Sequence, residues 1–112
     1  VSLAASVVNK RQVVTGSPAR FAGDEDAAFS VVGVIPGSGG SFVSDTVGMM
    51  DAFVSGDISH HNAAMASAAR LGVIDAGHVP TERPGVEALY DAVCSVYPNT
   101  VRLRTDPHPW EE

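Results

Sequence analysis

The chain has 112 residues, 45% of them hydrophobic and 18% charged, which suits one small globular domain and excludes a disordered segment. A formal net charge of −6 argues against a large nucleic-acid surface and against attraction to anionic membranes, so we expect neither as a partner. The single cysteine leaves no internal disulfide, and with no signal-peptide pattern and no apolar run of about 20 residues we expect a cytoplasmic protein.

The N-terminal third of the sequence predicts a helix followed by two strands. Apolar residues at helical spacing indicate a helix over 2–14. A short strand is expected over 19–22, before an acidic turn. The run 29–35 is rich in Val and Ile and carries no charge, which indicates a strand buried on both faces of a sheet. It leads into the glycine-rich segment 36–42, which we expect to form a turn.

A second helix and strand are expected directly after this turn. Val43, Val47 and Met50 recur at i, i+4 and i+7, the spacing of one helix face. Residues 52–55 are then typical of a short apolar strand, which Gly56 would end.

The next helix has recognisable signals at both ends. Ser59 is a suitable N-cap, because its hydroxyl can accept a bond from a free N–H of the first turn. Ala64, Ala68 and Leu71 would form the buried face, and Gly72 would occupy the position just after the C-terminal end.

The C-terminal part predicts a buried strand over 73–76, a tight turn, and a long helix with Thr81 as its N-cap. Pro98 would stop this helix. Its buried face is predicted to be the apolar stripe Val86, Leu89, Tyr90, Val93, Cys94 and Tyr97. An edge strand is expected over 101–104, with an irregular tail after it.

Alternating strands and helices predict the fold class α/β. We expect a mostly parallel or mixed sheet with helices packed on it in a layered α/β/α arrangement. Open sheets of this kind bind ligands beyond the carboxyl ends of their strands. The three strand-to-helix junctions at 36–42, 56–61 and 77–82 are therefore the candidate functional segments.

The first junction could bind an anion. Ser38, Gly39 and Gly40 are candidate substrate-binding residues, since glycines let the backbone approach a ligand and N–H groups at a helix start attract anions. The segment matches neither the phosphate-loop pattern nor the dinucleotide fingerprint. A tight structural turn explains it equally well, and both interpretations stay open.

The second junction carries two adjacent histidines. Side chains of His60 and His61 at a helix start point about 100° apart, so they are poorly placed to bind one ion together. Either could act as a catalytic proton donor or acceptor in a pocket. Residue type alone favours a purely structural role, with Asp57 as a helix-start anion that takes no part in chemistry.

The third junction holds the strongest metal-ligand candidates, His78 and Glu82. A neutral imidazole and a carboxylate suit divalent ions such as zinc, iron or manganese. Pro80 argues against a continuous helix through both residues, so we expect their approach to depend on the turn. Two ligands are too few for a closed site. The alternative is a capping Glu and a buried, hydrogen-bonded His.

Three segments, 37–41, 55–61 and 74–78 followed by Thr81 and Glu82, occur in the order and spacing of a known family. In this the chain resembles the GTP cyclohydrolase 1 type 2 homologues, also called NGG-one-interacting-factor-three-like proteins. The resemblance extends over the whole chain and is most specific between Val31 and Glu87.

The resemblance implies an α/β domain that holds two divalent metal ions in a cleft. The family's C-terminal His and Glu ligands carry over onto His78 and Glu82, while its other ligands lie in an N-terminal half that this sequence lacks. Residues 1–112 would then be the C-terminal part of a single metal-binding domain, in a homo-oligomer that could be a hexamer. The sequence departs from the family pattern at Ile35-Pro36 and Val79-Pro80.

These expectations lead to a metal-dependent, hydrolase-like protein that acts on a small anionic substrate, with metal-activated water as the nucleophile. The alternative is a non-enzymatic, oligomeric interaction or scaffold protein with a structural metal site. A third possibility is a nucleotide-binding module built on the glycine-rich turn.

Overall fold

The computed structural model describes residues 19–103. The helix expected over 2–14, Arg104 and the tail after it lie outside this part. The described elements, in chain order, are β1 (Arg20–Ala22), β2 (Val32–Ser38), the 3-10 turn η1 (Gly40–Phe42), α2 (Val43–Thr46), β3 (Ala52–Gly56), α3 (His60–Ala68), β4 (Gly72–Asp75) and α4 (His78–Val96).

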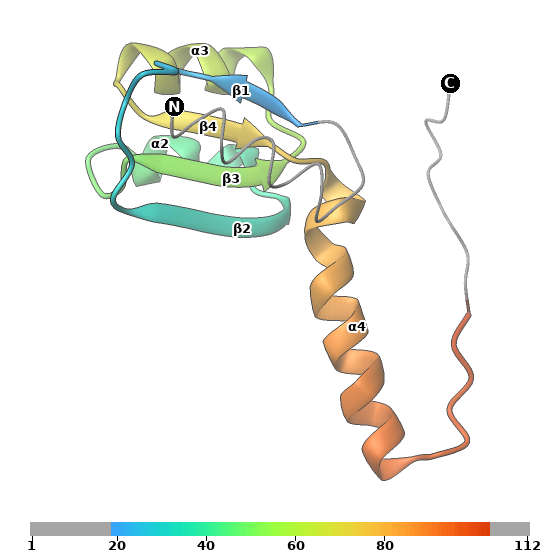
Figure 1. Ribbon diagram of the computed structural model, residues 1–112. Helices are drawn as coiled ribbons and strands as arrows, with labels where there is room; N and C mark the ends of the chain where they lie inside the picture. Colours follow the sequence, from blue (N-terminus) through green and yellow to red (C-terminus); the bar gives the residue numbers. More distant parts are fainter. Residues whose placement is uncertain (1–18, 104–112) are drawn as a thin grey trace.

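The strands of the described part form one mixed sheet in the order β1-β4-β3-β2 (Figure 1). Strands β2, β3 and β4 are parallel, and β1 adds to β4 in the antiparallel direction. This confirms the predicted α/β class. Parallel neighbours end at the same edge of a sheet, so the segments that follow β2, β3 and β4 are brought together there.

The main core lies between the sheet and helices α2 and α3, which contact each other. Its buried residues come from the sheet, the two helices and the segments that connect them: Val43, Phe53, Ile58, Ala66, Leu71 and Val73. Strand β3 is one of the two inner strands, and every one of its residues is buried. The strands predicted over 19–22, 52–55 and 73–76 are thus confirmed, and each of their ends differs from the prediction by one residue or less.

Strand β2 differs from its prediction. It continues through Pro36 and Gly37 to Ser38, with an irregular register against β3, so the glycine-rich turn begins only at Gly39. It was expected to be buried on both faces, but it is an edge strand, and the Val34 side chain is 62% exposed. An apolar run cannot by itself distinguish a central strand from an edge strand.

Helices α2 and α3 differ from their predictions in where α2 ends and in which residues of α3 are buried. Helix α2 ends at Thr46, so Val47 is exposed instead of continuing the buried face. In α3 the N-cap Ser59 is confirmed, since its hydroxyl accepts the Asn62 N–H, but Ala66 is the buried residue and Ala64 and Ala68 are exposed.

The C-terminal end of α3 also differs from the prediction in which residue adopts the left-handed conformation. Arg70, with φ 60°, takes the left-handed position expected for Gly72. Gly72 instead begins β4 beneath an aromatic ring, where an added Cβ would come within 2.7 Å of Phe29. Close packing, and not a helix end, is what requires glycine there.

Helix α4 begins at one end of the sheet and extends away from it (Figure 1). It starts at His78 after the N-cap Gly77, which lies four residues before the expected cap Thr81, and it stops before Pro98 as predicted. None of its residues is buried, and Leu89 on the predicted core stripe is 64% exposed. Residues 101–103 form no strand, so that prediction is wrong for the described part. No helix within residues 19–103 has the length and apolar character needed to cross a membrane.

Candidate functional site

His78 and Glu82 lie side by side at the start of α4. They are four residues apart on successive helical turns, and the His78 Nε2 atom is 3.2 Å from the Glu82 Oε1 atom. Our expectation that Pro80 would interrupt the helix between them is wrong. Pro80 is the third residue of α4, and residues of the first turn have no helical acceptor for their N–H groups, so proline costs little there.

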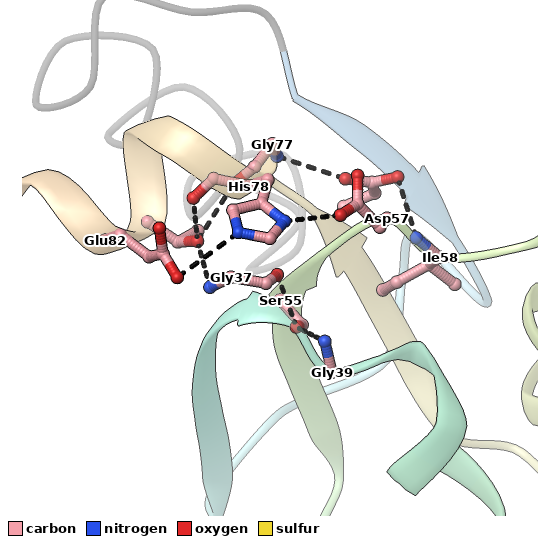
Figure 2. Close-up of polar contacts among 10 residues, drawn as sticks. Gly37, Gly39, Ser55, Asp57, Ile58, Gly77, His78 and Glu82 are labelled. Carbon is pink, nitrogen blue, oxygen red and sulfur yellow. Dashed lines mark hydrogen bonds and ion pairs between the residues drawn. The ribbon is translucent and has the colours of Figure 1, made fainter. Parts of the chain in front are cut away.

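A third residue, Asp57, completes this arrangement from the neighbouring strand. It follows β3 directly, and its Oδ2 atom lies 2.5 Å from the Nδ1 atom of His78. Figure 2 shows the His78 ring between the carboxylates of Asp57 and Glu82, each facing a different ring nitrogen. The hydrogen bond to Asp57 is the main cause that raises the pKa of His78 above its usual value of 6.5. Residue type alone favours a purely structural role for Asp57.

The position of Asp57 near His78 follows once β3 and β4 are known to be neighbouring strands. Two parallel neighbouring strands end at one edge, so residues just beyond Gly56 and just beyond Ala76 are expected to be close. The only carboxylate next to Gly56 is Asp57, and the imidazole beyond Ala76 is His78. What the sequence did not show is that β3 and β4 are neighbours.

Gly37 packs directly against the His78 and Glu82 pair. Its φ is +75°, which favours glycine, and a Cβ added there would lie 2.5 Å from Glu82 Oε1 and 3.3 Å from His78 Nε2. Its N–H donates to Thr81 Oγ1 at 2.8 Å, which connects the end of β2 to the first turns of α4. The glycine-rich segment therefore borders the pair, as the junction argument predicted.

The predicted anion-binding residues are held mainly by bonds within the protein. The Gly39 N–H donates to the buried Ser55 hydroxyl at 2.8 Å, and the Gly40 carbonyl accepts the Asn62 side-chain amide at 2.8 Å. Gly39 and Gly40 are buried, whereas Ser38 is exposed. These contacts fit the structural-turn interpretation of Gly39 and Gly40. A substrate-binding role of the three residues stays a prediction.

His60 and His61, the candidate catalytic residues, are exposed at the start of α3. His60 lines a hollow of about 220 Å³ with residues of β1 and β4, and His78 and Glu82 are not among its lining residues. Asp75 at its edge accepts bonds from Arg20 and from the Gly77 N–H. The structure therefore does not bring His60 into the His78 and Glu82 arrangement, and a proton-transfer role stays a prediction.

The donor atoms of His78 and Glu82 are of types that suit a divalent cation, and one imidazole nitrogen lies 3.2 Å from one carboxylate oxygen. Within residues 19–103, however, no group of three or more His, Cys, Asp or Glu side chains could hold a metal ion. Two donors of this kind are too few for a closed metal site, so a ligand role of His78 and Glu82 stays a prediction.

Comparison with known proteins shows the family of this chain. The sequence model of Duf34/NIF3 (NGG1p interacting factor 3) matches residues 1–107. The chain belongs to the Duf34/NIF3 family. This confirms the resemblance on which the His78 and Glu82 assignment was based.

Curated relatives of this chain include two proteins named "GTP cyclohydrolase 1 type 2 homolog". The protein of Clostridium acetobutylicum is 38% identical over 68 residues, which are 60% of this chain and 25% of that protein. The protein of Pyrococcus abyssi is 39% identical over 62 residues, which are 55% of this chain and 25% of that protein. The chain thus spans about a quarter of the length of the curated relatives it matches.

Solved structures share the fold. Hypothetical protein SA1388 of Staphylococcus aureus superposes with a TM-score of 0.78 at 22% identity, covering 97% of this chain and 33% of that one. The protein ybgI, described as of unknown function, superposes with a TM-score of 0.71 at 26% identity, covering 87% of this chain and 39% of that one. The Duf34/NIF3 fold of this chain is thus part of a larger architecture in each of these neighbours.

Proposed function

We propose that this chain contributes two ligands, His78 and Glu82, to a divalent-metal centre of a hydrolase-like protein. The observation that carries the proposal is the 3.2 Å approach of His78 Nε2 to Glu82 Oε1 at the carboxyl edge of the sheet. Zinc, iron and manganese are the ions that this pair of donors suits. Such an ion supplies Lewis acidity, which polarises a substrate oxygen and lowers the pKa of water.

The other parts of the site have separate proposed roles. Gly37 has no side chain and so leaves room for the His78 and Glu82 side chains to approach each other. A small anionic substrate would lie beside the segment Ser38–Gly40, with His60 or His61 exchanging a proton. The curated relatives carry the name of a GTP cyclohydrolase homologue, so hydrolysis of a nucleotide ring is the reaction we would test first.

Two donors alone would hold an ion weakly, because zinc sites usually have three or four protein ligands. We propose that the remaining ligands come from parts of the protein outside residues 19–103, with two metal ions in the complete site. The relatives' greater length is consistent with this arrangement.

An oligomeric scaffold that uses the metal only for structure is the second candidate. It is favoured by the exposed apolar face of α4, where Val86, Leu89 and Val96 are uncovered. We propose self-association through this face, with a hexamer as one possible assembly.

The proposal is tested by titrating the chain with Mn²⁺ and recording the paramagnetic broadening of backbone NMR signals. We expect the first signals to broaden around the start of α4 and Gly37, and we expect this broadening to disappear in both His78→Ala and Glu82→Ala. His61→Ala is the matched control, because it removes an exposed imidazole from α3. Broadening that persists in both variants, or that is centred elsewhere, would refute the metal assignment.

A further inference from the structure

The two ring nitrogens of His78 have different surroundings. Nδ1 lies 2.5 Å from Asp57 Oδ2, within strong hydrogen-bond distance, whereas Nε2 lies 3.2 Å from Glu82 Oε1. A neutral imidazole carries a proton on only one nitrogen, and the other nitrogen has the lone pair. An ionised carboxylate can only accept, so the short contact with Asp57 favours the tautomer with its proton on Nδ1.

The backbone at Asp57 supplies an independent observation. Its φ is 53°, in the left-handed region that non-glycine residues seldom adopt, and only Arg70 shares this property within the described residues. Glycine would adopt this conformation without strain. A carboxylate in a strained turn that faces a histidine is typical of a functional constraint.

A stabilising role explains this contact poorly. The side chains of His78 and Asp57 are 43% and 53% exposed, and ion pairs at such exposure contribute little to folding. Orientation of the ring is the more direct consequence, since His78 can rotate about its side-chain bonds unless Nδ1 is held.

We propose that Asp57 is a positioning residue, whose carboxylate accepts the Nδ1–H of His78 and thereby directs the Nε2 lone pair toward the cation site beside Glu82. This inference rests on the proposed function, because the tautomer of His78 affects function only if its Nε2 atom binds a cation. It predicts that Asp57→Asn acts through the tautomer: the amide can donate to Nδ1 and so favour the proton on Nε2, which blocks metal binding.

The test reads the tautomer first, in metal-free chain labelled with ¹⁵N at histidine and held at a pH where imidazole is neutral. The chain has four histidines, so the His78 signals are assigned by their loss in His78→Ala. We expect the Nδ1–H form in the wild type and a shift toward the Nε2–H form in Asp57→Asn. Asp57→Gly relieves the backbone strain, and we expect a mixture of both tautomers in a chain at least as stable as the wild type.

The second readout is the affinity for Zn²⁺, which is measured from the change of the same His78 NMR signals during a titration. We expect Asp57→Asn and Asp57→Gly to weaken binding by roughly 10- to 100-fold. Asp45→Asn removes a carboxylate from an exposed position of α2, and Arg70→Gly relieves the other left-handed residue. Neither control should change the tautomer or the affinity.

The outcomes separate this inference from the proposed function. If Zn²⁺ has no effect on His78 in the wild type, the proposed function fails and this inference fails with it. If Zn²⁺ binds His78 in the wild type while Asp57→Asn leaves the tautomer or the affinity unchanged, the inference about Asp57 alone is overturned. A tautomer shift together with weaker Zn²⁺ binding supports it.

Discussion

Ser55 connects the glycine-rich turn to the centre of the sheet, and its removal is the most direct test of how the site is supported. The side chain is fully buried on β3, with 0% exposure. Its hydroxyl accepts the Gly39 N–H at 2.8 Å and donates to the Gly37 carbonyl at 3.3 Å. Ser55→Ala keeps the Cβ atom and removes only these two bonds, and it leaves the buried Gly39 N–H without its acceptor.

The expected cost follows from that unsatisfied donor. A buried polar group that loses its only partner destabilises a protein by about 1–3 kcal/mol. For a domain of this size we expect the melting temperature to fall by roughly 4 °C or more per kcal/mol. Thermal and urea unfolding measure the change, and Ser95→Ala is the control, since Ser95 makes an exposed bond on α4. A Ser55→Ala variant as stable as the control would refute the argument.

Three further predictions follow from the same contacts. His78→Ala and Glu82→Ala should melt like the wild type in chelator and diverge only with added metal, whereas equal destabilisation in both conditions would contradict the ligand assignment. Gly39→Val should cost roughly 1–3 kcal/mol in urea unfolding because of crowding, since Gly39 has φ −99° and a Cβ there would lie 2.4 Å from Ser55 Oγ. NMR titration of metal-free protein should give a lower pKa for His78 in Asp57→Asn than in the wild type, because the Asp57 carboxylate raises it. The small stabilisation from that pair should be complete below the unfolded-state pKa near 6.5 and should be lost as pH rises through the folded-state pKa, and a pKa unchanged by Asp57→Asn would contradict it.

Local signals in the sequence located most of the elements and indicated part of the candidate site. Short apolar runs between turn residues predicted β1, β3 and β4, and Ser59 predicted the start of α3. These predictions succeeded because the signals for short strands and helix caps lie in residues that are close together in the sequence. The prediction that His78 and Glu82 are ligands came from local pattern and from the family resemblance, and the family match confirms the resemblance.

Burial and the partner of His78 were decided by tertiary structure. The apolar run of β2 resembles a central strand in sequence, but it lies at the edge of the described sheet. No residue of the α4 stripe is buried, because that helix extends away from the sheet. Asp57 and His78 are 21 residues apart and meet only because β3 and β4 are parallel neighbours that end at one edge. The sequence by itself determined which residues carry donor atoms and where the chain turns. Strand order determined which of those atoms meet, since pairing between distant segments is a property of the whole sheet and not of any local run of residues.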